Sequence, residues 1–274
     1  MNDLDPRTTL ARPDLARQAL EGIVRAERFA PTRAAQCVAA STAIRRAPDS
    51  TAEQMDQLIF GEAFDVLERR GGWVWGQARR DGYVGWVAEV ALDEAVIAPT
   101  HRVSALRAYA FPEPDVKAGH AMLLTQNALV TVEAREGKFA RIARAGWVAE
   151  HQLADLLAFE DDAATVAEAY LGAPYQWGGR ESLGLDCSGL VQQALFACGR
   201  ACPRDADMQA RELGEEISPA DLRRGDLVFW PDHVAILLDE ERLVHANGWH
   251  MAVAVEPLVE ALKRHGEPTV YRRP

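Results

Sequence analysis

Three residues in the last third of the sequence, Cys187, His233 and His245, are of the types that act together in thiol-based catalysis. Cys187 opens a segment whose apolar residues recur every three or four positions as far as Gly199, which predicts a helix. A thiol at a helix N-terminus lies among unpaired N–H groups and the positive end of the helix dipole. We therefore expect a lowered pKa and a reactive thiolate. A single cysteine is more often a buried apolar residue, so its neighbours carry the argument.

The two histidines belong to segments that predict neighbouring strands. His233 begins residues 233–238, His245 lies in residues 243–246, and a charged turn separates the two segments. Antiparallel pairing would bring both rings to one face of a sheet, where His245 can fix the tautomer of His233. A cysteine nucleophile needs a base, and the base needs an orienting group. We therefore expect Cys187 to attack, His233 to act as the base and His245 to orient it.

Five short motifs surround these residues, in the order YQWGG (175–179), DCSGLV (186–191), GDLVF (225–229), HVAI (233–236) and VHA (244–246). Their order and spacing resemble the NlpC/P60 family of cysteine peptidases, over roughly residues 160–274. The resemblance implies a papain-like α+β domain, with a cysteine-bearing helix packed on a histidine-bearing antiparallel sheet. It also implies hydrolysis of amide bonds in peptidoglycan stem peptides, with no metal and no organic cofactor.

The same resemblance suggests which residues bind the substrate. Tyr175 matches a family tyrosine whose hydroxyl helps to bind the substrate or its oxyanion. Asp186 and Ser188 flank the nucleophile on the side that lines the substrate. Arg204 or the Ser188 hydroxyl would receive the free α-carboxylate of a D-glutamyl residue, and alanine at position 206, where some relatives carry a hydroxyl, weakens this expectation.

A repeated pentapeptide indicates two further domains. GWVAE occurs at residues 85–89 and again at 146–150, 61 residues later, after similar openings. The repeat predicts two all-β units that resemble the bacterial SH3 (SH3b) domain, and the first copy matches better. We therefore expect four parts: an N-terminal helical segment (1–33, with a short helix over 13–22), two SH3b domains (34–98 and 99–154) and an NlpC/P60 domain (155–274).

Two SH3b domains before an NlpC/P60 domain resemble the γ-D-glutamyl-L-diamino-acid endopeptidases of murein-peptide recycling. Those enzymes require a free N-terminal L-Ala, whose ammonium group is held by an acidic residue and a tyrosine of the first SH3b domain. Glu53 and Tyr83 are the candidates here, since a carboxylate and a phenol oxygen both pair with an ammonium. The alternative is equally open for each: Glu53 as a solvated charge and Tyr83 as an aromatic residue of the barrel core.

Composition narrows the class of protein. The chain has 274 residues, 48% of them apolar and 26% charged, which predicts a globular protein of two or three domains. A net charge of −11 argues against nucleic-acid and anionic-membrane partners. The polar N-terminus lacks the pattern of a secretory signal, so we expect a cytoplasmic protein, most simply a monomer, with reduced cysteines. Cys198 and Cys202 lack a second ligand pair, so we expect no metal there.

Two other functions stay open. One is a thiol amidase or acyltransferase on the same core that acts on a substrate unrelated to the cell wall. The other is a non-catalytic peptidoglycan-binding protein, although the intact set of Cys187, His233 and His245 argues against it.

Overall fold

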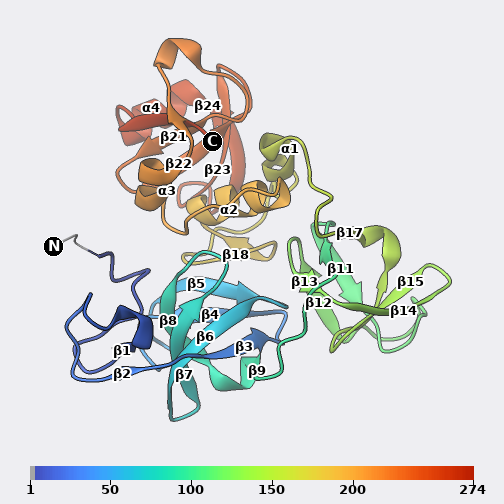
Figure 1. Ribbon diagram of the computed structural model, residues 1–274. Coiled ribbons are helices and arrows are strands. Elements are labelled where there is room, and N and C mark those ends of the chain that lie inside the picture. Colours follow the sequence, from blue (N-terminus) through green and yellow to red (C-terminus); the bar gives the residue numbers. More distant parts are fainter. Residues whose placement is uncertain (1–3) are drawn as a thin grey trace. The chain divides into compact units, whose positions relative to one another are not determined.

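A computed structural model describes residues 4–274, and the chain divides into two compact units after Leu156 (Figure 1). The N-terminal unit is built almost wholly of strands, and the C-terminal unit combines helices with a sheet. Within residues 4–274, every helix is too short or too polar to cross a bilayer.

The first β-module is a seven-stranded sheet in the order β5-β4-β8-β7-β6-β3-β9. The alternating pattern at residues 64–68 and the Gly71-Gly72 turn form the β6–β7 hairpin as predicted, and both glycines have positive φ. One face of this sheet buries an apolar core that includes Ile44, Phe64 and Val87. The strands are β3 (Arg33–Cys37), β4 (Ser41–Arg45), β5 (Gln54–Ile59), β6 (Ala63–Arg70), β7 (Trp73–Ala78), β8 (Val84–Ala88) and β9 (Leu92–Asp93).

The second β-module is made of three small antiparallel sheets, β13-β10-β17, β11-β12 and β14-β15-β16. Both copies of the repeated pentapeptide have the same local structure. β8 leads into the 3₁₀ turn Glu89–Ala91, and β16 leads into the 3₁₀ turn Glu150–Gln152. The strands are β10 (His101–Val103), β11 (Arg107–Ala110), β12 (Met122–Thr125), β13 (Leu129–Val130), β14 (Val132–Glu136), β15 (Phe139–Ile142), β16 (Gly146–Ala149) and β17 (Leu153–Asp155).

The predicted helix over residues 13–22 is wrong. The segment contains a two-residue strand, β1 (Ala16–Arg17), and a 3₁₀ turn at Gln18–Leu20. Strand β1 pairs in parallel with β2 (Phe29–Ala30). The reason is tertiary: Leu10 and Leu15 are both buried in one cluster with tryptophans of the first β-module. A tight turn, in which Arg12 and Leu15 exchange backbone hydrogen bonds, brings both leucines to that cluster. Residues 1–3 of the predicted segment lie outside the described part.

The C-terminal unit has a six-stranded sheet in the order β20-β25-β21-β22-β23-β24. Its helix α2 (Cys187–Ala197) packs against β22 and β23, and α1 (Ala163–Glu168) packs against α2. This is the α+β arrangement that was predicted. The other elements are β18 (Arg180–Glu181), β19 (Gly184–Leu185), α3 (Ala206–Glu212), β20 (Glu215–Glu216), the 3₁₀ turn Pro219–Asp221, β21 (Leu227–Trp230), β22 (His233–Leu237), β23 (Arg242–Asn247), β24 (Ala252–Pro257), α4 (Leu258–His265) and β25 (Val270–Arg273).

Candidate active site

The sulfur of Cys187 lies where helix α2 meets the sheet. Cys187 is the first residue of α2, directly after the N-cap residue Asp186, and only 8% of it is exposed. The backbone N–H groups of Ser188 and Val234 donate to its sulfur. Val234 follows His233 in strand β22, so the fold brings the thiol beside the start of the strand that carries the first histidine.

The two histidines form a direct chain of contacts. Nε2 of His233 lies 2.8 Å from Nδ1 of His245, and both rings are buried. Strands β22 and β23 are antiparallel neighbours, as predicted. Nε2 of His245 in turn lies 2.9 Å from Oε1 of Glu256, although its N–H is not directed along that line. Arg264 binds the same carboxylate at 2.6 and 2.9 Å.

The contacts among Glu256, His245 and His233 select the tautomers of both histidine rings. A proton on Nε2 of His245 faces the Glu256 carboxylate, which leaves Nδ1 of His245 as an acceptor. His233 then donates its Nε2–H to that nitrogen, and its Nδ1 keeps a lone pair. The first histidine is therefore held in the form that accepts a proton from a thiol.

Burial, and not the helix dipole, dominates the ionisation of the site. Burial raises the pKa of Cys187 to about 12, and the neighbouring Asp186 carboxylate adds to the rise. Burial lowers the pKa of His233 to about 3, and His245 and His265 act in the same direction. The predicted lowering of the Cys187 pKa is thus wrong. With these pKa values, Cys187 is a neutral thiol and His233 a neutral imidazole before substrate binds.

Tyr175 lies near Cys187, and a negative charge on that sulfur would raise the pKa of the Tyr175 phenol. The residue is half-buried, and its backbone is tied to Met251 by a 3.0 Å hydrogen bond. Burial raises the pKa of Tyr175 to about 12, with smaller contributions from Cys187 and Asp186. The phenol is therefore neutral at ordinary pH and keeps a hydrogen to donate.

Each of the two units of the chain contains a segment that matches a known family model. The model of the NlpC/P60 family matches residues 172–265, and the model described as the bacterial dipeptidyl-peptidase Sh3 domain matches residues 44–92. The C-terminal unit is an NlpC/P60 domain. A bacterial SH3 domain lies ahead of it, and the second SH3b domain, at residues 99–154, stays a prediction.

Relatives with both parts of the chain carry peptidase names. "Dipeptidyl-peptidase 6" of Lysinibacillus sphaericus is 27% identical over 226 residues, covering 73% of this chain and 82% of that protein. "Gamma-D-glutamyl-L-lysine dipeptidyl-peptidase" of Bacillus subtilis is 25% identical over 227 residues, covering 75% and 76%. The crystal structure of an NlpC/P60 family protein from Bacillus cereus covers 88% of this chain and 99% of its own, with a TM-score of 0.77 and 20% identity, which shows a shared fold.

In the NlpC/P60 domain, Asp186, Ser188 and Arg204 bind one another. Arg204 is 1% exposed and donates to both carboxylate oxygens of Asp186, at 2.9 and 2.7 Å, and to the Ser188 hydroxyl at 2.8 Å. Asp186 also accepts from the N–H groups of Gly178 and Gly189. Arg204 and Ser188 are therefore internal partners that fix the N-terminus of α2, and a role for either in receiving a substrate carboxylate stays a prediction.

The two candidates in the bacterial SH3 domain have different surroundings. Glu53 is partly exposed and binds Arg46 at 2.7 Å. Tyr83 is only 3% exposed and packs in the apolar core of the first β-module, as in the second of the two alternatives left open for it. Arg46 hydrogen-bonds Glu53 and lies within electrostatic range of Tyr83. The role of Glu53 and Tyr83 in ammonium binding stays a prediction.

Three residues of the site were missed from the sequence. Glu256 and Arg264 complete the chain behind His245, and His265 stacks on His233 with ring centroids 4.7 Å apart. A buried glutamate within the apolar strand β24 is the one local signal that pointed to a partner. His265 lies in the last turn of a surface helix, where a histidine has an ordinary capping explanation.

Proposed function

We propose that this protein is a cysteine peptidase that hydrolyses peptidoglycan-derived peptides. Two observations carry the proposal: Cys187 lies beside the backbone of Val234, the residue that follows His233, and His233 contacts His245 at 2.8 Å. Together these residues supply a nucleophile, a base with a free lone pair and a group that orients the base. The peptidase names of the relatives that span both parts of the chain support the same reaction class.

The proposed reaction starts from the neutral pair. As the sulfur of Cys187 attacks the scissile carbonyl carbon, its proton passes to the free nitrogen of His233. The hydroxyl of Tyr175 and the backbone N–H of Cys187 stabilise the oxyanion, and one such donor contributes about 3 kcal/mol. His233 returns the proton to the departing amine. Water, deprotonated by His233, then cleaves the thioester and releases the acid.

More specifically, we propose that the enzyme cleaves the amide bond between the γ-carboxyl of D-glutamate and the L-diamino acid. Its substrates would be peptides with a free N-terminal L-Ala. The printed name of the Bacillus subtilis relative supports the γ-D-glutamyl specificity. Glu53 would supply a carboxylate and Tyr83 a phenol for the terminal ammonium, and both lie within electrostatic range of Arg46. We further propose that the enzyme acts on short recycled peptides in the cytoplasm.

The test is hydrolysis of L-Ala-γ-D-Glu-diaminopimelate by the full chain. Cys187→Ala should abolish release of L-Ala-D-Glu and leave the circular dichroism spectrum and melting temperature unchanged. Turnover by the folded variant refutes the thiol mechanism. Transfer of the dipeptide to an added amine, in preference to water, would identify an acyltransferase.

The requirement for a free amine is tested on the substrate. N-acetylation of the L-Ala removes the ammonium, and we expect kcat/KM to fall at least about tenfold, the cost of one charged pair of about 1.4 kcal/mol. Glu53→Gln should remove most of that discrimination. Equal cleavage of both peptides by the wild-type protein contradicts the proposed specificity.

A further inference from the structure

We propose that His245, His250 and Glu256 form an inhibitory site for a divalent transition-metal ion such as Zn²⁺. The three residues lie on strands β23 and β24 and on the turn between them (Figure 1). One ligand atom from each residue lies within 4.8 Å of the other two. Two imidazoles, a carboxylate and a water are a common donor set for zinc.

A buried nitrogen without a hydrogen-bond partner points into this group. His245 is completely buried, and its Nε2 makes no hydrogen bond, although Oε1 of Glu256 lies only 2.9 Å away. A buried polar atom without an aligned partner costs free energy. A metal ion bound to Nε2 would satisfy that atom and would also take an oxygen of the adjacent carboxylate.

The other ring nitrogen of each histidine is already held, as in built metal sites. Nδ1 of His245 contacts His233 at 2.8 Å, and Nδ1 of His250 lies 3.0 Å from Oδ1 of Asn247. The same oxygen accepts the backbone N–H of His250 at 2.8 Å. With Nδ1–H donated to Asn247, His250 keeps its lone pair on Nε2, and its exposed position gives an ion access from solvent.

Metal binding would require a small movement of His250, and Arg264 would compete with the ion for Glu256. Ligand atoms around a tetrahedral zinc with bonds of about 2.1 Å lie roughly 3.4 Å apart, so the exposed His250 must move inward. Arg264 binds both oxygens of Glu256 and competes for that carboxylate. The site is therefore weaker than a permanent zinc centre, which suits reversible inhibition.

Metal binding would reverse the tautomers of His245 and His233. The resulting inhibition rests on the proposed function. An ion on Nε2 of His245 forces the ring proton onto Nδ1. That proton is then donated to Nε2 of His233, so His233 carries its own proton on Nδ1. The base loses the lone pair that accepts the thiol proton, and no bond to Cys187 is needed for inhibition.

Binding is measured in the Cys187→Ala chain, where the thiol is absent, with Co²⁺ as the probe. We expect one ion per chain with visible d–d bands, displaced by Zn²⁺. His250→Ala on that background should weaken Co²⁺ binding at least about tenfold, and His120→Ala, which removes an exposed histidine of the other unit, should not. Absence of binding, or equal binding by the His250→Ala chain, overturns the proposal.

Inhibition is measured on the wild-type chain with Zn²⁺ and reversed with a chelator. His250→Ala should raise the half-inhibitory Zn²⁺ concentration at least about tenfold relative to its own uninhibited rate. Unchanged sensitivity would place the inhibitory ion at Cys187 and His233 and overturn the proposal. Since Co²⁺ binding is read without turnover, failure of the proposed peptidase activity leaves the metal site separately testable.

Discussion

The charge state of Cys187 follows from its burial. A thiolate enclosed between helix α2 and strand β22 would lose its hydration, and Asp186 next to it repels a second negative charge. His233 is likewise kept neutral by burial and by neighbouring rings. Separate ions would be costly here, so proton transfer and sulfur attack are expected to occur together. At the residue scale, the proposed mechanism is therefore general-base catalysis by His233.

The pH profile should reveal this neutral pair. A pKa of about 3 keeps His233 unprotonated on the acid side, whereas an ordinary imidazole with a pKa of 6.5 is mostly protonated at pH 5. We expect kcat/KM at pH 5 to stay within about threefold of its value at pH 7, measured with a peptide substrate.

The free energy of unfolding, unlike kcat/KM, should change with pH in this range. The unfolded chain binds protons on His233 and His245 below pH 6.5, and the folded chain does so only near pH 3, so stability falls as the pH falls through that window. Initial rates must therefore be taken while circular dichroism shows a folded protein. A steep loss of kcat/KM between pH 7 and 6 in folded protein contradicts the neutral-pair mechanism.

Tyr175 offers a test of oxyanion stabilisation. Its phenol stays protonated because burial raises the pKa to about 12. Tyr175→Phe removes only the donor, so kcat should fall about 10²- to 10³-fold, with a smaller change in KM. Tyr109→Phe, at an exposed tyrosine of the other unit, is the control. An unchanged kcat would exclude the phenol from the transition state.

At the element scale, the N-terminus of α2 is fixed by a buried charge network. Asp186 caps the helix through Gly189, holds the preceding loop through Gly178, and is neutralised by Arg204. The same carboxylate raises the pKa of Cys187. The network therefore positions the nucleophile and also keeps it protonated.

Arg204→Met separates the structural role from a role in substrate binding. Loss of one partner leaves the Asp186 carboxylate buried without its counter-ion, which should lower the free energy of unfolding by about 3–5 kcal/mol. Arg211→Met removes an exposed pair of the same unit and should cost less than about 1 kcal/mol. Urea denaturation measures both. A stable Arg204→Met chain with a raised KM would support the substrate role.

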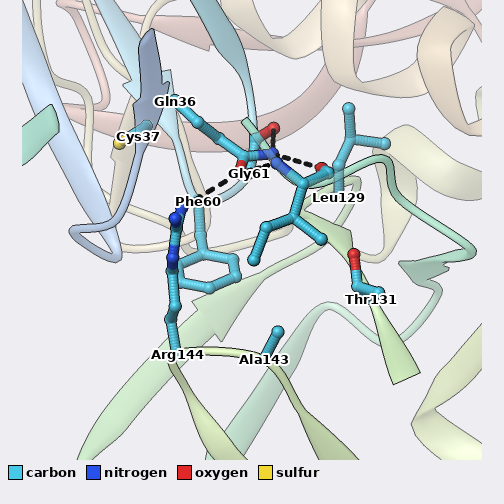
Figure 2. A pocket seen from close by; sticks show the side chains of 9 residues that line it. Gln36, Cys37, Phe60, Gly61, Leu129, Thr131, Ala143 and Arg144 are labelled. Atoms are coloured by element: carbon cyan, nitrogen blue, oxygen red, sulfur yellow. Dashed lines mark hydrogen bonds between the residues drawn. The ribbon is translucent and has the colours of Figure 1, made fainter. Parts of the chain in front are cut away.

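At the scale of the whole molecule, the two β-modules of the N-terminal unit join through backbone contacts. Figure 2 shows Gly61 against Leu129, with Gln36 and Arg144 reaching across the same junction. Arg144 donates to Oε1 of Gln36 at 3.1 Å, and the N–H of Leu129 donates to the carbonyl of Phe60 at 3.0 Å. The junction therefore depends on close backbone approach at Gly61.

Gly61→Ala tests that junction against a matched control. A Cβ at Gly61 would lie 1.8 Å from the carbonyl oxygen of Leu129, and Gly72, with the same φ of +82°, has nothing within 4 Å. Both substitutions cost about 1 kcal/mol of backbone strain, and only Gly61→Ala adds the clash. We expect it to lower the free energy of unfolding of the N-terminal unit by at least about 2 kcal/mol more than Gly72→Ala. Equal losses in urea denaturation would mean that the modules separate freely.

The sequence by itself determined the features that depend on local pattern. Helix α2 with Cys187 at its start, the strands of both histidines and the repeated strand-turn unit follow from apolar periodicity and turn residues, which short segments contain. Only the tertiary structure decided the protonation of Cys187, the partners of Arg204 and the contact of Glu256 with His245. These depend on desolvation and on groups far apart in the chain, and local spacing carries no information about either.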